Sequence, residues 1–292
     1  MFTAYSNHYL FLVFGSALCW GLLDFLRKFF GTKRSAELIA FLLTIGQVPI
    51  FIAWAFLDEF TFHDPLYLFP GILVVVLHTI ASIAFVRAVS IAPLSETVPF
   101  LSISPVVATL LALTIGEIPT PLQTVGIFLV VIGVLFVSTN EEGSEKKGLI
   151  QLLMENKGGQ LMLFVGVCWG TTLFLDKVSL MFASAAFHGL FLTLLMTVTL
   201  GFIVLLKERS LGLNLFVSKP FINLLPLSAG AALILQFLAI QGFPAGLFES
   251  IKRAVGVLMA LGLGALFYKE KITAKKLFAA ALLIFGVFLT LS

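Results

Sequence analysis

The stretch ESIKR at residues 249–253 sets Glu249, Lys252 and Arg253 into a run that is otherwise apolar from Gly242 to Phe267. A charged side chain near the middle of a membrane helix costs about 2.5 to 3.5 kcal/mol even on the lenient insertion scale. Three such side chains close together are therefore not expected to face lipid. The stretch predicts an internal, hydrated cavity that the rest of the chain has to enclose.

The composition places this cavity in a membrane protein. The chain is 60% hydrophobic and only 11% charged, with a mean hydropathy of +1.10, which is outside the range of ordinary soluble domains. A formal charge of +3 gives nucleic-acid binding no support. No basic segment or small-residue cleavage site precedes the first apolar run, so this run is expected to be a retained helix and not a signal peptide.

Ten apolar segments are long enough to cross a bilayer, and all are expected to be helices because a chain in lipid must satisfy its backbone hydrogen bonds internally. They lie at 8–27, 36–57, 67–90, 94–115, 121–139, 159–178, 184–206, 221–242, 246–268 and 274–291. The expected fold is all-α and polytopic, with a first five-helix repeat at 1–140, a polar connector at 141–158 and a second repeat at 159–292. The apolar residues 149–154 predict a short helix on the membrane surface.

An internal repeat relates the two halves. Cys-Trp-Gly at residues 19–21 recurs at 168–170, and Lys28 recurs as Lys177, both at an offset of 149. At an offset of 153, Glu96 corresponds to Glu249, and the turn at 117–120 corresponds to the turn at 270–273. Because each half holds an odd number of helices, the second copy enters the membrane from the opposite side, which predicts an inverted repeat.

The basic residues indicate the orientation. Fifteen of the eighteen lie in, or next to, connectors on one side of the membrane, which the positive-inside rule makes cytoplasmic. This charge bias puts both termini outside. The three exceptions are Lys177, Lys252 and Arg253, which can converge on one cavity if the sixth and ninth helices face each other.

Each candidate site residue also has a structural interpretation. Lys252 and Arg253 can recognise an anion, or they can extend to a nearby interface or pair with Glu249, three and four residues before them. Lys177 can be an interfacial anchor partnered by Asp176. Glu96 precedes prolines 99 and 105, which suit either a broken helix at a binding site or a curved helix.

The aromatic and histidine candidates also have two interpretations each. Trp20 and Trp169 can form walls of the cavity or can serve close packing. His78 can carry a proton, as can His188, or each can be a hydrogen-bonded packing residue. No catalytic motif, nucleotide-binding loop or metal-ligand spacing is present in the sequence, so neither an enzyme nor a cofactor is expected, and active transport would be secondary.

With the repeat, the ten spans, the paired Trp-Gly sequences and the turns Gly-Glu-Ile-Pro-Thr at 116–120 and Lys-Glu-Lys-Ile-Thr at 269–273, the chain resembles the drug/metabolite transporter superfamily, EamA type. The resemblance covers essentially the whole chain. It implies alternating access and a central cavity formed mainly by helices one, three, four, six, eight and nine. It also implies cytoplasmic termini, which conflicts with the charge bias.

Residues 248–273 are in addition similar to helix nine of the sugar-phosphate and triose-phosphate translocators of that superfamily. In those proteins a Lys-Arg pair and a lysine of helix six hold the substrate phosphate. Matched by position, these roles fall to Lys252, Arg253 and Lys177.

The resulting hypothesis is a multi-pass cell-membrane permease that moves a small metabolite with a phosphate or carboxylate group. Glu249 and Glu96 would tune the cations or carry a coupled proton, and the alternative to a coupling proton is a counter-substrate. One alternative is an exporter of amino acids or other neutral or cationic solutes. Another is a non-transporting membrane subunit or scaffold. Neither the coupling ion nor the oligomeric state follows from the sequence.

Overall fold

The computed structural model describes residues 6–31, 34–92, 97–138, 157–208, 210–213, 216, 220–268 and 272–292. Within these ranges the regular structure is helical, apart from one isolated β-bridge between Phe62 and Ala183. The predicted surface helix at 149–154 and the site candidate Glu96 lie outside the described residues.

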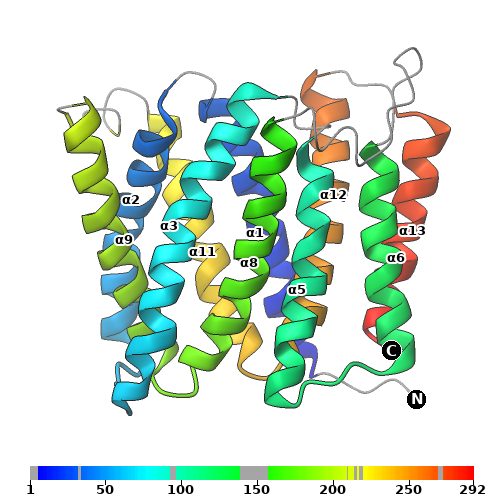
Figure 1. Ribbon diagram of the computed structural model, residues 1–292, viewed down its shortest axis with the longest axis horizontal. Coiled ribbons are helices and arrows are strands. Elements are labelled where there is room, and N and C mark those ends of the chain that lie inside the picture. Colours follow the sequence, from blue (N-terminus) through cyan, green and yellow to red (C-terminus); the bar gives the residue numbers. More distant parts are fainter. Residues whose placement is uncertain are drawn as a thin grey trace.

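The helices of the first half lie where the apolar runs predict them (Figure 1). They are α1 (Asn7–Gly31), α2 (Ala36–Leu57), η1 (Pro65–Tyr67) leading into α3 (Leu68–Ile91), η2 (Val98–Ser102), α5 (Ile103–Ala112), η3 (Leu113–Ile115) and α6 (Pro121–Ser138). The second half holds α8 (Lys157–Ser179), α9 (Ala185–Glu208), η4 (Pro220–Asn223), α11 (Leu224–Ile240), α12 (Ala245–Tyr268) and α13 (Ala274–Thr290). The ten-helix, all-α prediction is confirmed.

These helices are those of an integral membrane protein. In the described part of the chain, seven are long and apolar enough to cross a membrane, and shorter apolar helices occupy 100–115 and 121–137. Large apolar side chains are exposed on the outer surfaces, among them Phe11, Phe69 and Phe202. Such exposure is costly in water and natural in lipid.

The fourth span differs from a plain membrane helix. It begins as the 3₁₀ turn η2, continues as the ten-residue α5, and ends in the 3₁₀ turn η3, after which Gly116 takes a left-handed conformation with φ of 83°. Pro99 and Pro105 lie near the start of this span. Because proline has no backbone N–H to donate, it suits the first turn of a helix and disfavours a continuous helix through residues 94–115.

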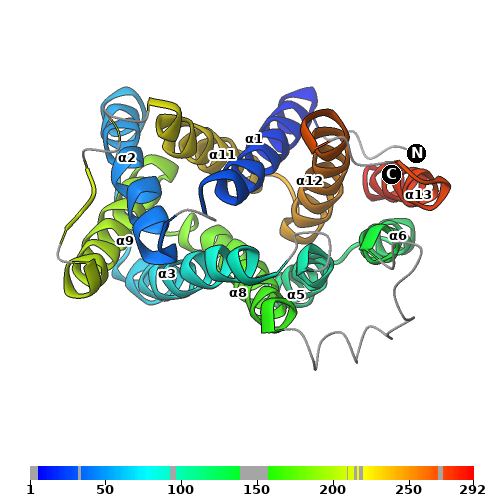
Figure 2. The ribbon, with the colours of Figure 1, turned by 90° about the horizontal axis from the view of Figure 1, so that it is seen from above.

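Helix packing follows an approximate two-fold relation between the halves (Figure 2). Helix α3 packs against α8 as α11 packs against α1, and α1 packs against α12 as α8 packs against α5. The corresponding helices α2 and α9 pack against each other, as do α6 and α13, which lie together at one end of the molecule (Figure 2). This pattern is expected of two inverted five-helix repeats. The residue boundaries of the repeats remain a prediction.

The bundle has two faces, which are named here by the segments that reach them. Helix α1 begins and α13 ends at one face, the termini face, whereas α6 ends and α8 begins at the other, the connector face (Figure 1). At the connector face the buried Glu37 of α2 pairs with Arg87 of α3 and with Lys207 of α9, whose Nζ lies 2.6 Å from the carboxylate. This cluster fixes three helices at that face.

Candidate functional site

A small cavity lies at the centre of the bundle. Its walls come from α1, α3, α8, α11 and α12, and they are formed by Trp20, His78, Trp169, Thr172, Leu173, Gln236, Lys252 and Arg253. The free space between these side chains is about 10 Å³, which is room for about one water molecule. In this conformation the site is therefore closed around its polar groups.

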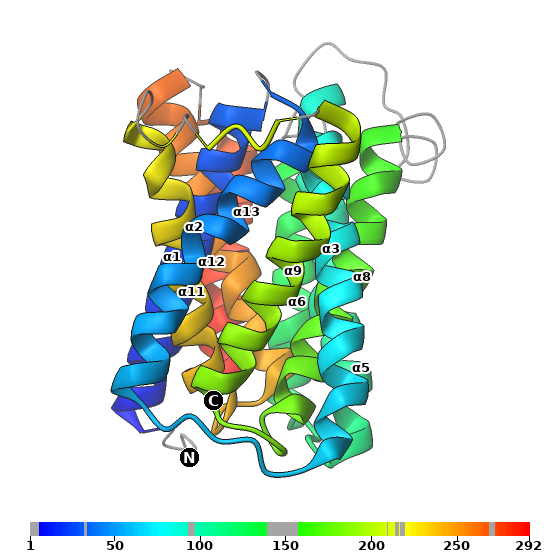
Figure 3. The same ribbon diagram turned by 90° about the vertical axis from the view of Figure 1, so that its left-hand side faces the viewer.

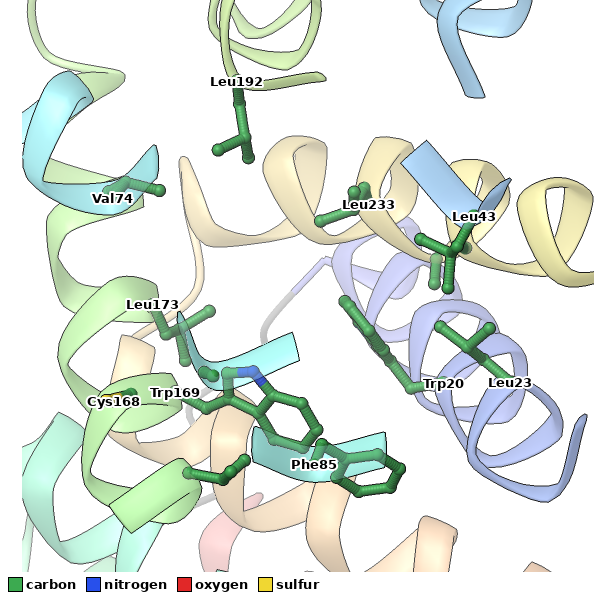
Figure 4. Packing of buried hydrophobic residues seen from close by; sticks show 14 of the residues in the cluster. Trp20, Leu23, Leu43, Val74, Phe85, Cys168, Trp169, Leu173, Leu192 and Leu233 are labelled. Atoms are coloured by element: carbon green, nitrogen blue, oxygen red, sulfur yellow. The ribbon is translucent and has the colours of Figure 1, made fainter. Parts of the chain in front are cut away.

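The two repeat-related tryptophans meet at this cavity. Trp20 of α1 and Trp169 of α8 have ring centroids 6.5 Å apart, and both extend into the same space, with Phe85 of α3 beside Trp169 (Figure 4). The Trp20 Nε1–H donates to Gln236 Oε1 at 3.0 Å. The sequence allowed Trp20 either to line the cavity or to serve close packing. In the structure it lines the cavity, and this hydrogen bond fixes the orientation of its indole.

Three cationic groups surround the tryptophan pair. Lys252 Nζ lies 5.4 Å from the Trp20 ring centroid, and Arg253 Cζ lies 5.4 Å from that of Trp169. Arg27 Cζ lies 5.8 Å from Trp20 and 5.6 Å from Trp169. All three cations are buried, with exposures of 4 to 7%, so each cation–π contact is largely desolvated and is worth about 1 to 2 kcal/mol.

Two carboxylates balance part of this charge. Glu249, fully buried, pairs with Lys252 and accepts a hydrogen bond from Arg253 Nε at 3.0 Å. Ser104 of α5 donates to the same Glu249 oxygen at 2.7 Å. The fourth span, which contains Pro99 and Pro105, thus helps to hold the Glu249 carboxylate in place. Asp24 pairs with Arg27 at 3.3 Å. Around the tryptophan pair three cations thus face two carboxylates, and a third carboxylate, that of Asp176, lies beyond Gln236.

Arg27 is the site residue that the sequence does not reveal. Its charge pattern places Arg27 among the basic residues at the end of the first helix, next to Lys28, Lys33 and Arg34. In the structure α1 continues to Gly31, so Arg27 lies one turn inside the helix and is only 4% exposed. The i, i+3 spacing from Asp24 was the available signal, because a buried arginine needs a nearby carboxylate.

Lys177 does not line the cavity. Its ammonium pairs with Glu117, in the turn after α5, and donates to the Phe243 carbonyl oxygen at 3.0 Å. The second oxygen of Glu117 accepts from the Ala245 N–H at 2.8 Å, at the start of α12. The predicted role of Lys177 in substrate binding stays a prediction, since in this conformation its two partners are protein groups near the termini face.

A buried polar chain leads away from the cavity toward the termini face. Gln236 Nε2 donates to Asp176 Oδ2 at 3.2 Å, Asp176 Oδ1 lies 3.1 Å from His188 Nε2, and His188 Nδ1 lies 2.9 Å from the Tyr67 hydroxyl. Asp176 and His188 have no exposed surface. Asp176 is thus engaged with Gln236 and His188, whereas its sequence position suggested a partner for Lys177.

The arrangement gathers charged and aromatic side chains and does not resemble a metal centre. Within the described ranges, no group of three or more His, Cys, Asp and Glu side chains is placed to hold a metal ion. His78 lines the cavity as an aromatic and polar wall residue. Cys19 and Cys168 are free thiols.

Comparison with known proteins agrees with the fold. Residues 8–139 match the model of the EamA-like transporter family. A solved structure titled "Crystal structure of protein" aligns with a TM-score of 0.75 over 98% of this chain and 96% of its own, at 16% identity, which shows the shared fold alone. Among curated proteins no match is found. The first half of the chain thus matches the EamA-like transporter family, and the chain along its whole length shares its fold with a solved structure.

Proposed function

We propose that this protein is a secondary transporter that moves a small anionic metabolite, one with a phosphate or carboxylate group, across the membrane by alternating access. The observation that supports it most is the convergence of Arg27, Lys252 and Arg253 on the Trp20–Trp169 pair in a buried cavity. Directly around the tryptophan pair, three buried cations face two carboxylates, and this local imbalance favours a ligand that brings negative charge.

The chemistry of the three cations suits an oxyanion. Arginine offers a planar fork of N–H donors that matches two oxygens of a carboxylate or phosphate, and lysine offers a compact charge. Both Lys252 and Arg253 now share Glu249. An entering anion would take over part of this coordination, so Glu249 and Asp24 hold the cations in place while the site is empty of substrate.

Alternating access follows from the size of the cavity. Room for about one water molecule cannot admit a metabolite, so helices must move for substrate to enter. The cavity is lined by helices of both halves, namely α1 and α3 from the first and α8, α11 and α12 from the second. Rocking of one inverted repeat against the other would open it to each face in turn.

Purified protein in liposomes tests this proposal. Uptake is measured for a charge series of radiolabelled solutes: inorganic phosphate, phosphate monoesters, dicarboxylates, zwitterionic amino acids and amines. We expect saturable uptake of an anion, and kcat/KM at least tenfold lower in Lys252→Gln and in Arg253→Gln. Lys157→Gln, which changes an exposed lysine at the start of α8, is the matched control. Normal uptake of the true anion by both cavity variants would refute the site.

A second candidate is transport of a neutral or cationic solute. It is favoured by the pairing of the cations within the site, Lys252 and Arg253 with Glu249 and Arg27 with Asp24. Aromatic walls also suit an organic cation. Uptake of amines or amino acids, with no competition by anions, would select this candidate. Lack of saturable flux for every class would instead favour a non-transporting subunit.

A further inference from the structure

We propose that His188, paired with Asp176, is the binding site for a proton that is transported together with the anion. This inference rests on the proposed anion transport and adds its coupling ion and the residues that carry it. It concerns the polar chain Trp20–Gln236–Asp176–His188–Tyr67, whose members link the cavity wall to the termini face.

The donors of this chain converge on one carboxylate. Trp20 donates to Gln236 Oε1, and Gln236 Nε2 donates to Asp176 Oδ2. From the other side, a neutral His188 with its proton on Nε2 donates to Asp176 Oδ1, and the Tyr67 hydroxyl donates to the free His188 Nδ1. Each of these polar atoms then has a hydrogen-bond partner, and the Asp176 carboxylate carries no proton. A second proton enters at His188 Nδ1 once the Tyr67 hydroxyl rotates to become the acceptor.

The charges of the buried site show when that proton is needed. Counted together with Asp176, which lies beyond Gln236, the wider cluster has three carboxylates, the others being Glu249 and the partly buried Asp24, against the cations Arg27, Lys252 and Arg253. With no anion bound and His188 uncharged, this wider cluster has no net charge. A bound anion adds uncompensated negative charge to a closed, poorly solvated space, which is costly. Protonation of His188 cancels one unit of it.

Glu249 is a poorer proton carrier than this pair. It holds two cations at once and accepts from Ser104, so its oxygens are already engaged by three partners. In the described part of the chain, by contrast, the only ion-pair partner of Asp176 is His188. Histidine is also the side chain whose charge changes in the physiological pH range.

The surroundings of His188 contain few other titratable groups. Tyr67 approaches from η1, Asp176 from α8 and, at longer range, His78 from α3. Helix α11 contributes Gln236 and the Phe237 ring, 4.9 Å from the imidazole. Helix α2 faces the neighbouring Gly189 with Phe51 and Trp54. The cations Arg27 and Lys252 interact with His78 at longer range.

An aromatic plug separates this pair from the termini face. Phe62, Phe187 and Phe191 surround the Tyr67 ring, with centroids 5.2 to 5.9 Å away. The loop between α2 and α3 is held on the loop between α8 and α9 by hydrogen bonds from Thr61 N to Ser184 Oγ and from His63 N to the Phe182 oxygen (Figure 3). Opening of these loops would expose the pair and the cavity to the same side, so that proton and anion enter or leave together.

The experiment uses full-length protein in liposomes that contain a fluorescent pH indicator, with the anion found by the uptake series and inorganic phosphate as the first probe. For wild type we expect anion entry to acidify the interior, and an inward proton gradient to raise anion accumulation several-fold. For His188→Gln, which cannot take up the compensating proton, we expect acidification to fall more than tenfold and anion counterflow to fall as well. For Asp176→Asn, in which the pair carries the charge of its protonated form, we expect counterflow within about threefold of wild type, while acidification falls more than tenfold. His63→Gln, an exposed histidine at the same face, should retain both activities.

Several results would overturn the inference. Anion flux in wild type without proton movement would refute coupling and leave the proposed function intact. Retained acidification in His188→Gln, or its loss in His78→Gln alone, would assign the proton elsewhere. If His188→Gln does not fold, Asp176→Asn replaces it, and unchanged coupling there refutes the pair. Absence of all anion flux in wild type refutes the proposed function and the coupling with it.

Discussion

At the scale of single residues, Arg27 and Lys177 show that the position of a buried cation depends on the groups with which it pairs. Arg27 lies beside Asp24 and against three aromatic rings, those of Trp20, Phe85 and Trp169. Lys177 instead meets Glu117 and a backbone carbonyl oxygen. Sequence position alone made Lys177 the more unusual cation. Only the fold shows that its carboxylate partner comes from the other half of the chain.

Replacement of Arg27 tests its place in the site. We expect Arg27→Gln to weaken anion binding by about 10- to 100-fold, because a hydrogen bond to a charged group contributes about 1.5 to 3 kcal/mol and 1.4 kcal/mol is a factor of ten. Arg34→Gln, which changes an exposed arginine beyond the same helix, should leave binding unchanged. KM for the transported anion is the measurement. Equal KM values in the two variants would mean that Arg27 does not contribute to anion binding and serves only membrane topology.

At the scale of helices, the apolar runs predicted where the ten spans lie but not how they pair. Lipid requires each span to be helical whatever its neighbours, so length and hydropathy suffice for the bounds. Packing between helices depends on small residues and on polar contacts made in three dimensions, such as Ser104 with Glu249 or Gln236 with Asp176. For this reason the residues 249–253 indicated a cavity, while Arg27, Gln236 and Ser104 were found only in the structure.

The contact of α6 with α13 is a second example of packing that depends on small residues. A Cβ atom added at Gly126 would lie 2.7 Å from both the Gly286 oxygen and the Thr290 nitrogen. These two helices lie together at one end of the bundle and are paired mainly with each other (Figure 2). Their close approach therefore requires a residue without a side chain at position 126.

We expect Gly126→Ala to destabilise the protein by about 1 to 3 kcal/mol, since the methyl group meets backbone atoms that cannot move independently. Gly262→Ala is the matched control: its Cβ would have no atom within 4 Å, and alanine is favoured over glycine in a helix by about 0.5 to 1 kcal/mol. Thermal unfolding in detergent would show a lower midpoint for Gly126→Ala and an unchanged or higher one for Gly262→Ala. A similar midpoint in both variants would contradict the close packing.

At the scale of the whole molecule, the Lys177–Glu117 pair connects the two halves at the termini face. It joins the end of α8 to the turn after α5, and through the Ala245 N–H it also reaches the start of α12. The repeat maps Lys177 onto Lys28 and Glu117 onto Glu270. The side chain of Lys28 and the whole of Glu270 lie outside the described residues. By symmetry, the repeat predicts a matching pair that closes the connector face when the termini face is open.

Opposite effects of two glutamates on access to the cavity would test this symmetry. The reporter is Thr172→Cys, at a cavity-lining position, in a protein whose Cys19 and Cys168 are replaced by serine. We expect Glu117→Gln to speed labelling by an impermeant maleimide added at the termini face, because it weakens the pair with Lys177. Glu270→Gln should speed labelling from the connector face and slow it from the termini face. Glu59→Gln, at an exposed position of the termini face, controls for surface charge. Changes of the same sign at both faces would mean that the glutamates stabilise the bundle in general and do not alternate as gates.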